Sequence, residues 1–322
     1  MELEIIYEPI QEDLLRVEDK LKSVSEVEFS HLSELLSYIL SGGKAIRPVL
    51  TLLCGKFYNY NLDLLLPMAT AVELFHIATL VHDDAIDNSV VRRGRPTINS
   101  LWGQDRAVLL GDYLFAKAGE LTATTQNLRV IMLFAQTLET ISSGELNQSF
   151  NAFNLNQSRE DYVQRIYSKT ASLFCLATES GAILSQAPEE SVKILRGYGY
   201  NLGIAFQIVD DILDFIGTED EMGKPMGSDL TQGTLTLPAM LLLERYPEDN
   251  PVKRLFQNEG DREKNIKLAI ELVRDDSSLI QQCYKVASEY CSKACRNLDL
   301  LPDTASRGAL VKIADYVITR RR

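Results

Sequence analysis

Apolar residues recur every three to four positions along most of the chain, which is the spacing that places them on one face of an α-helix. This pattern predicts amphipathic helices from about residue 4 to 40, and two long apolar helices from about 48 to 88, joined near Tyr58–Asn61. A stretch rich in Gly, Asp and Pro at 217–233 is predicted as a loop. Further helices are predicted at about 104–121, 126–153, 159–185, 189–216, 234–245, 262–274, 276–298 and 304–319.

The predicted elements indicate an all-α protein. No stretch alternates strictly between apolar and polar residues, and nothing resembles a flexible linker or a low-complexity tract. The chain has 322 residues and is 45% hydrophobic, so it can bury a large core. We therefore expect one domain spanning 1–322, built as a bundle of ten or more helices around a central cavity.

The charge balance narrows the possible partners. The chain carries 33 Lys and Arg against 45 Asp and Glu, a formal net charge of −12, which argues against general nucleic-acid binding. The acidic start Met1–Glu4 does not resemble a signal peptide, and no window reaches the length and purity expected of a membrane span. We therefore expect a cytoplasmic protein with no integral membrane segment.

Two aspartate-rich motifs stand out inside apolar stretches that are predicted as helices. Residues three or four apart share a helix face, so each motif brings its carboxylates close together. Like charges at that spacing repel each other and are costly to bury, so a cation is expected between them. Oxygen ligands without His or Cys suit Mg²⁺ shared with a phosphate-bearing substrate. The motifs are Asp83-Asp84-Ala85-Ile86-Asp87 and Asp210-Asp211-Ile212-Leu213-Asp214.

Basic residues lie near these acids along the chain. Arginine favours bidentate recognition of phosphate, and lysine supplies a point charge. Six carboxylates with several cations suit a diphosphate held through Mg²⁺ at one position and by bare cations at another. The basic residues concerned are Lys44, Arg47, Arg92, Arg93, Lys169 and Lys224.

The chain resembles the trans-isoprenyl diphosphate synthases, or polyprenyl synthetases, of the medium- and long-chain type. The resemblance extends from about residue 30 to the C-terminus and rests on several motifs in the expected order. They are GGKAIRP (42–48), LVHDDAIDNSVVRRGRPT (80–97), GDYLFA (111–116), GELNQ (144–148), KTASLF (169–174), FQIVDDILDF (206–215), GKPMGSDL (223–230) and TLP (236–238).

The resemblance implies an isoprenoid synthase fold and a role for each group of residues. Asp83, Asp84, Asp87, Asp210, Asp211 and Asp214 would hold three Mg²⁺ ions on the allylic diphosphate. Arg92, Lys169 and Lys224 would contact that diphosphate, and Lys44, Arg47, Arg93 and His76 would bind isopentenyl diphosphate. Thr170 and Gln207 are similar to residues that flank the reacting carbons.

The implied reaction is chain elongation by a homodimeric prenyltransferase. Carbon–oxygen cleavage gives an allylic carbocation and a diphosphate, whose charge Mg²⁺ and the basic groups stabilise. The double bond of isopentenyl diphosphate then attacks the cation, and the departed diphosphate accepts a proton. One departure from the family pattern is Thr234, which stands where a lysine usually helps to bind the allylic diphosphate. It could weaken substrate affinity, or Lys224 and Arg92 could suffice.

The residues before the first motif bear on product length. Thr79 and Ala78 precede Asp83 by four and five positions, about 6–8 Å deeper along a helix. Short-chain members of the family usually carry an aromatic residue there, whereas both residues here are small. Phe75, and Phe134 on another helix, could form a deeper floor. The resemblance therefore implies a medium- or long-chain product, built on farnesyl diphosphate or a similar primer.

Three alternatives stay open. The first is a geranylgeranyl diphosphate synthase. The second is a class I terpene cyclase, although such enzymes usually lack both GGKxxRP and a second aspartate motif. The third is a weakly active partner subunit of a heteromeric synthase, which only Thr234 favours. The basic end Arg320–Arg322 could be a solvated tail, or it could close over the diphosphate. Exact chain length, primer, pathway and assembly do not follow from the sequence.

Overall fold

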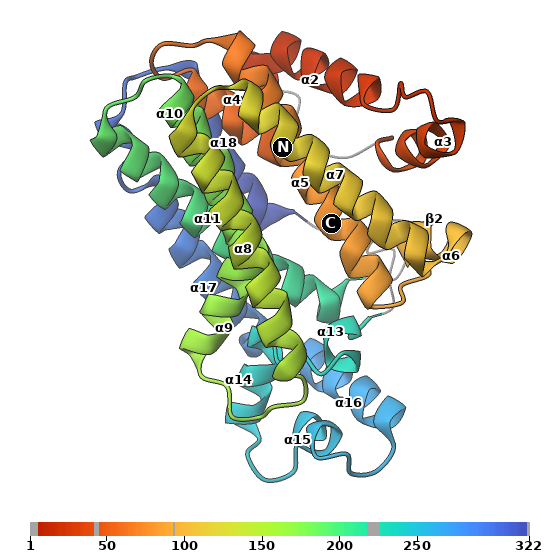
Figure 1. Cartoon of the computed structure of the whole chain (residues 1–322). Helices are drawn as coiled ribbons and strands as arrows, with labels where there is room; N and C mark the ends of the chain where they lie inside the picture. The colour runs from red at the N-terminus through yellow and green to blue at the C-terminus, as the bar shows by residue number, and fades with distance from the viewer. Residues whose placement is uncertain (1–5, 42–44, 93, 218–225, 321–322) are drawn as a thin grey trace. The chain divides into compact units, whose positions relative to one another are not determined.

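The computed structural model describes residues 6–41, 45–92, 94–217 and 226–320, which form helices almost throughout (Figure 1). This confirms the predicted all-α fold of ten or more helices. From the N-terminus to residue 150, the helices are η1 (Glu8–Ile10), α2 (Gln11–Ser23), α3 (Ser30–Ile39), α4 (Ile46–Gly55), α5 (Leu62–Ile86), α6 (Ile98–Trp102), α7 (Gln104–Thr124) and α8 (Leu128–Phe150). They continue with α9 (Arg159–Ile166), η2 (Tyr167–Ala171), α10 (Ser172–Leu184), α11 (Glu189–Ile216), α13 (Ser228–Thr231), α14 (Leu237–Arg245), α15 (Pro251–Phe256), α16 (Arg262–Asp275), α17 (Ser277–Cys295), η3 (Leu298–Leu300) and α18 (Ala305–Thr319).

The basic turn after the first aspartate motif is a minimal hairpin. Strand β1 (Val91–Arg92) pairs antiparallel with β2 (Arg95–Pro96), with Val91 opposite Pro96. Gly94 turns the chain at φ 73°, in the left-handed region that glycine adopts at little cost. The sequence predicted the turn but not the pairing, which fixes the position of Arg92.

The helix predicted at 159–185 contains an irregularity. Helix α9 is followed by a π-helical turn, η2, before α10 begins. A single π turn inside a helical run is uncommon and is often found at functional sites. It carries two of the predicted site residues, Lys169 and Thr170. Propensity gives no signal for such a turn, so the sequence predicted an uninterrupted helix.

The described chain divides into two compact units. The first comprises residues 1–138, 173–199 and 295–313. In it, α5 packs against α2, α4 and α7 (Figure 1). Helices α5 and α7 approach closely at Gly111, where a Cβ atom would lie 2.1 Å from the ring of His82. The ring of His82 therefore packs where the two helices meet, and the single-domain organisation over 1–322 stays a prediction.

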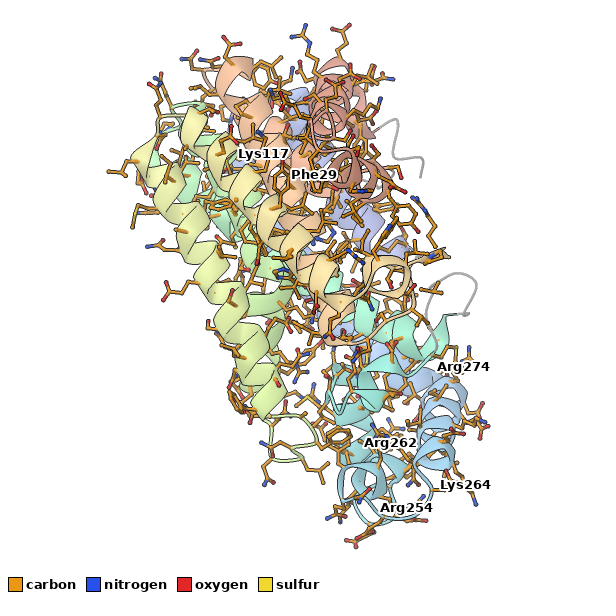
Figure 2. The ribbon with its side chains drawn as sticks, turned by 45° about the vertical axis from the view of Figure 1, so that its right-hand side comes forward. Phe29, Lys117, Arg254, Arg262, Lys264 and Arg274 are labelled. Atoms are coloured by element: carbon orange, nitrogen blue, oxygen red, sulfur yellow. The ribbon has the colours of Figure 1, made fainter. Side chains whose placement is uncertain are left out.

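The second unit comprises residues 139–172, 200–294 and 314–322. Here α16 packs against α14 and α15, and Figure 2 shows the basic side chains Arg254, Arg262, Lys264 and Arg274 on α15 and α16. Two of these side chains hold loops in place. Arg262 donates to the carbonyl of Thr231, and Arg274 donates to the carbonyl of Gly217 at 3.0 Å.

Helix α5 corrects one expectation. By length and composition this helix of 25 residues could span a membrane, although no such window was predicted. However, 61% of its apolar window is buried within the protein. A core helix of a globular protein has the same length and composition, and the burial of α5 against its neighbours accounts for its largely apolar sequence.

Candidate active site

The first aspartate cluster lies at the C-terminal end of α5. Asp84 is buried, Asp83 is half-buried, and Asp87 is exposed and caps the helix. Arg92, on the hairpin, donates from Nε to Oδ1 of Asp84 at 2.8 Å. Burial raises the pKa of Asp84, because desolvation outweighs the attraction of the guanidinium. The sequence-predicted diphosphate ligand Arg92 is thus already placed against a predicted metal ligand.

Both clusters occupy a helix end where negative charge is unfavourable. Carbonyl groups give the C-terminal end of a helix a partial negative charge, which disfavours nearby carboxylates. Neither α5 nor α11, both fully described, has a basic residue in its last turn. Each helix therefore places acids at its end without compensation from its own sequence, and a cation supplied from outside would relieve that cost.

The second cluster lies at the end of α11, within the second unit. The side chain of Asp210 is 36% exposed, whereas Asp211 and Asp214 are buried. Tyr162 donates to Oδ2 of Asp211 at 2.7 Å, and Gln207 donates to its Oδ1 at 2.8 Å. Burial, followed by repulsion from Asp229, raises the pKa of Asp211 to about 8.

The third acid of this cluster holds the following loop. Asp214 accepts the hydroxyl hydrogen of Ser228 at 2.8 Å and the backbone N–H of Asp229 at 3.2 Å. These are donors at the start of α13, so Asp214 caps that short helix. Of the three acids, Asp210 has the most exposed side chain and is therefore the most accessible to a ligand.

The π turn links one of its predicted residues, Thr170, to this cluster through Gln207. Thr170 donates from its hydroxyl to Oε1 of Gln207 at 2.6 Å, and the same Gln207 donates to Asp211. Lys169 pairs with Glu145 of the GELNQ motif at 2.8 Å between Nζ and Oε1. The structure thus brings Thr170 and Gln207 together, as their predicted shared role requires.

In the first unit, Arg47 is the second residue of α4 and is buried. Its guanidinium lies over the ring of Phe174, with Cζ 4.8 Å from the ring centroid. Ala45, just before the helix, adopts a left-handed conformation at φ 47°, which is costly for a residue with a side chain. His76 is half-buried on α5. The predicted residues Lys44, Arg93 and Lys224 lie outside the described residues.

Below the first cluster, α5 carries the predicted chain-length residues. Ala78 is fully buried, and Thr79 is half-buried and donates to the carbonyl of His76 at 2.7 Å. Phe75 is fully buried and meets Phe134 edge to face, with ring centroids 5.1 Å apart. Phe115 on α7 adds a third ring, 5.2 Å from Phe75. Sequence reasoning named Phe75 and Phe134 and missed the part of Phe115 in this cluster.

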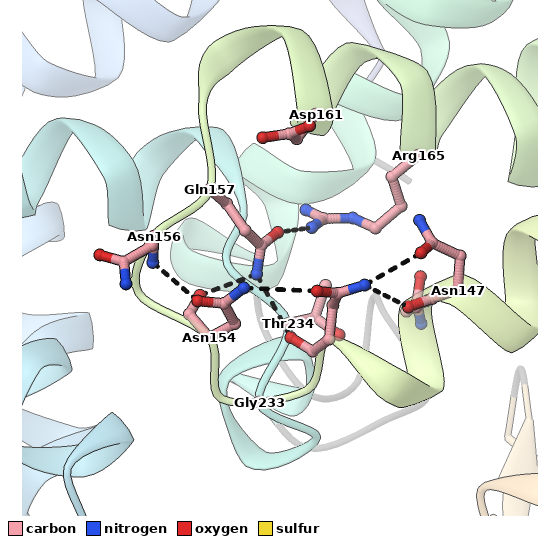
Figure 3. Close-up of a pocket in the computed structure, with 10 residues that line it drawn as sticks. Asn147, Asn154, Asn156, Gln157, Asp161, Arg165, Gly233 and Thr234 are labelled. Atoms are coloured by element: carbon pink, nitrogen blue, oxygen red, sulfur yellow. Dashed lines mark hydrogen bonds between the residues drawn. The ribbon is translucent and has the colours of Figure 1, made fainter.

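A polar pocket of about 170 Å³ lies elsewhere in the second unit (Figure 3). Figure 3 shows Arg165 beside Gln157, to which it donates at 2.6 Å; it also donates to the carbonyl of Leu235 at 2.5 Å. Thr234, the residue that replaces the family lysine, lines this pocket. The other lining residues are Asn147, Gln148, Asn151, Asn154, Asn156, Asp161 and Gly233.

The chemistry of the acids fits Mg²⁺, although they are not gathered as a finished site. Among the described residues, no group of three His, Cys, Asp or Glu side chains converges on one point. The donors are all carboxylate oxygens, which Mg²⁺ prefers. The two clusters also lie at negatively polarised helix ends, and Asp84 and Asp211 have raised pKa values caused by burial. These are the properties of carboxylates that a divalent cation would neutralise.

Tyr162 had no role in the sequence analysis, and Arg320 was considered only within a basic end that could be a solvated tail or could close over the diphosphate. Tyr162 contacts Asp211 from α9, and Arg320 contacts Asp210 from the end of α18, at 2.7 Å. Tyr162 carries no local signal, because a tyrosine in an amphipathic helix is ordinarily a core residue. Arg320 is part of a basic stretch that could equally be a solvated end.

An all-α fold with aspartate clusters at the ends of two helices, each contacted by an arginine, defines the class of protein. The polyprenyl synthetase family model matches residues 29–273. The heptaprenyl diphosphate synthase component 2 of Geobacillus stearothermophilus is 39% identical over 321 residues, covering 98% of each chain. The chain belongs to the polyprenyl synthetase family, and the predicted prenyltransferase is confirmed.

Solved structures agree with this assignment. A polyprenyl synthase from Caulobacter crescentus CB15, complexed with calcium and isoprenyl diphosphate, matches with a TM-score of 0.94 at 32% identity. The match covers 100% of this chain and 98% of that one. The heptaprenyl diphosphate synthase of Staphylococcus aureus matches with a TM-score of 0.91 at 35% identity, covering 97% of this chain and 99% of that one.

Proposed function

We propose that this protein is an all-trans polyprenyl diphosphate synthase that makes a medium- or long-chain product. It condenses isopentenyl diphosphate onto an allylic diphosphate such as farnesyl diphosphate. The observation that carries this proposal is the pair of aspartate clusters at the C-terminal ends of α5 and α11, in a chain of the polyprenyl synthetase family. The similar proteins named heptaprenyl diphosphate synthases support the chain-length class.

The aspartates are the proposed ligands of Mg²⁺, with three ions per site. When bound, the ions stabilise the diphosphate as it leaves the allylic carbon. Asp210 is the most exposed acid of its cluster and is proposed as a direct ligand, while hydrogen bonds from Tyr162 and Gln207 orient Asp211. The proposed ligand set is Asp83, Asp84, Asp87, Asp210, Asp211 and Asp214. The calcium in the similar Caulobacter structure supports a divalent cation.

The basic residues divide between the two substrates. Arg92, Lys169 and Lys224 are proposed to bind the allylic diphosphate, and Lys44, Arg47, Arg93 and His76 to bind isopentenyl diphosphate. Thr170 and Gln207, joined by a hydrogen bond, are proposed to lie beside the carbons that react. In this arrangement no histidine is needed as a general base, because the departed diphosphate can accept the proton.

The proposed length control is the cluster of rings below Ala78. A small residue at this position leaves room that a bulky aromatic would occupy, and the buried ring of Phe75 lies about one turn deeper. Phe75 is held by Phe115 and Phe134 in edge-to-face contacts, which stiffen a floor. The product is therefore proposed to extend past Ala78 and Thr79 before it meets this cluster.

A cytoplasmic homodimer is the proposed form of the enzyme. Helices α7 and α8 expose apolar side chains, namely Val108, Leu109, Leu128 and Met132, which suits an interface. One specific observation favours a second candidate: the similar Geobacillus protein is named component 2 of its synthase. In that case the same surface would receive a different subunit, and this chain alone would be weakly active.

Incorporation of labelled isopentenyl diphosphate onto farnesyl diphosphate by the purified protein tests the proposal. The expected result is incorporation with Mg²⁺ that stops when EDTA is added and returns with excess Mg²⁺. Sedimentation of the same sample gives its assembly. A folded dimer that incorporates nothing with any allylic primer would contradict the proposed activity for the isolated chain and favour the partner-subunit alternative.

A further inference from the structure

The end of α18 is tied to the second aspartate cluster. Arg320 follows the helix directly, and its backbone N–H donates to the carbonyl of Tyr316 at 2.9 Å. From there its Nη2 donates to Oδ1 of Asp210 at 2.7 Å and to the carbonyl of Phe206 at 2.6 Å. All these residues belong to the second unit. Arg320 is therefore no solvated tail residue.

This guanidinium is closed off from solvent. Only 5% of the Arg320 side chain is exposed, and its Cζ lies 3.7 Å from the centroid of the Phe206 ring. Its Nε is buried and has no hydrogen-bond acceptor among the described residues. A buried donor without an acceptor is costly, so this placement depends mainly on the pairing with Asp210 and on the ring.

Asp210 is also the acid best placed to meet a cation, so one carboxylate has two possible positive partners. A guanidinium within hydrogen-bond distance of a carboxylate would lie close to any divalent ion bound by the same group. The two positive charges would repel each other strongly at that separation in a partly buried site. A bound diphosphate would supply the negative charge needed to offset this repulsion.

We propose that Arg320 takes the place of a divalent cation at Asp210 in the metal-free protein, and that metal binding together with a diphosphate displaces it. This inference rests on the proposed function, in which Asp210 is a metal ligand. It makes metal binding to the second cluster weak until substrate is present. Loading the site then releases the Arg320 side chain from Asp210.

Binding of Mn²⁺, followed by electron paramagnetic resonance, tests the competition without any turnover. In the absence of diphosphate, R320Q should bind Mn²⁺ about tenfold more tightly than the wild type. R320K, which keeps the charge, should stay near the wild type. K312Q removes a charge from an exposed position of α18 and is the matched control for net charge. With saturating inorganic diphosphate, the difference between R320Q and the wild type should narrow.

Trypsin provides a second readout on the wild type. Cleavage after Arg320, followed by intact mass, should be slow without metal and should accelerate when Mn²⁺ and inorganic diphosphate are both present. Equal or weaker Mn²⁺ binding by R320Q, with unchanged thermal unfolding, would overturn the inference.

A D210N variant separates this inference from the proposed function. If D210N loses Mn²⁺ binding and R320Q gains none, the inference alone fails. If D210N binds Mn²⁺ as the wild type does, Asp210 is no ligand, and the inference fails together with that assignment.

Discussion

The hydroxyl of Tyr162 donates a hydrogen bond to Oδ2 of Asp211 at 2.7 Å, and both side chains are almost completely buried. Burial raises the pKa of both groups, because each would carry its negative charge away from water. The tyrosine thus remains a donor at neutral pH and fixes one oxygen of Asp211, while Gln207 fixes the other. A residue on α9 consequently sets the geometry of an acid on α11.

Replacing Tyr162 with Phe removes one donor and keeps the ring. We expect Y162F to lose about 1–3 kcal/mol of unfolding free energy, because a buried carboxylate loses a partner. We also expect kcat to fall while KM for isopentenyl diphosphate changes little. Urea unfolding and steady-state kinetics measure the two effects. As a control, Y198F removes a buried hydroxyl of the first unit, which donates to the carbonyl of Leu310. An equal loss of kcat in Y198F would contradict the role given to Tyr162.

Replacing Ala78 with Phe should shorten the product. The new ring would fill the space between the first aspartate cluster and Phe75, so elongation would stop earlier. Since Ala78 is fully buried, the variant could also be strained, and F75A provides the opposite change. Opening the floor should lengthen the product. Chromatography of dephosphorylated products measures both, and unchanged lengths in A78F and F75A would refute the proposed tunnel.

Restoring a lysine at Thr234 should strengthen substrate binding. An ammonium at this position adds a positive charge to a loop of the second unit that follows the second aspartate cluster, so KM for the allylic diphosphate should fall several-fold with little change in kcat. T231K, which adds the same charge at an exposed position of α13, is the matched control. If T231K lowers KM as much as T234K, the gain comes from net charge and not from position 234.

Glu179 offers a test of stability against pH. Its side chain is only 11% exposed, and burial raises its pKa despite the nearby Arg196 and Arg129. A folded-state pKa above the ordinary value of 4.5 means that this group's contribution to stability falls as pH rises from that value towards the raised one.

The variant E179Q should therefore be more stable than the wild type at neutral pH, by up to about 1–2 kcal/mol, and no more stable at about pH 4. Urea unfolding at both pH values measures this difference. The exposed Glu189 is the control, because a hydrogen bond from Arg129 lowers its pKa and E189Q should lose stability at neutral pH. Destabilisation of E179Q at neutral pH would show that the arginines outweigh desolvation.

The sequence was informative where function depends on local spacing. Asp83 and Asp210 could be assigned to helix ends because helical periodicity surrounds them and breaks soon after. The family motifs also located Lys169, Thr170 and Gln207, of which the last two form a hydrogen bond. These features depend on residues close together in the chain, where pattern and geometry are linked.

Features that depend on tertiary contacts were not predictable. Nothing in the sequence indicates that Tyr162 contacts Asp211. Nor does it indicate that Arg320 is buried and pairs with Asp210, 110 positions away in the chain. The π turn at Lys169 likewise has no propensity signal. The sequence analysis also expected no window apolar enough to span a membrane, whereas α5 is one. A largely buried core helix and a helix that crosses a bilayer have similar compositions, so composition alone does not distinguish them.

The size of the product tests the central claim most directly. The purified protein is given Mg²⁺, farnesyl diphosphate and labelled isopentenyl diphosphate, and its dephosphorylated products are sized by chromatography. We predict a ladder whose longest members extend well beyond geranylgeraniol, because the small side chain of Ala78 leaves room for a longer product. A single geranylgeraniol band would contradict the medium- or long-chain assignment while leaving the family intact, and would place the floor at or above Phe75.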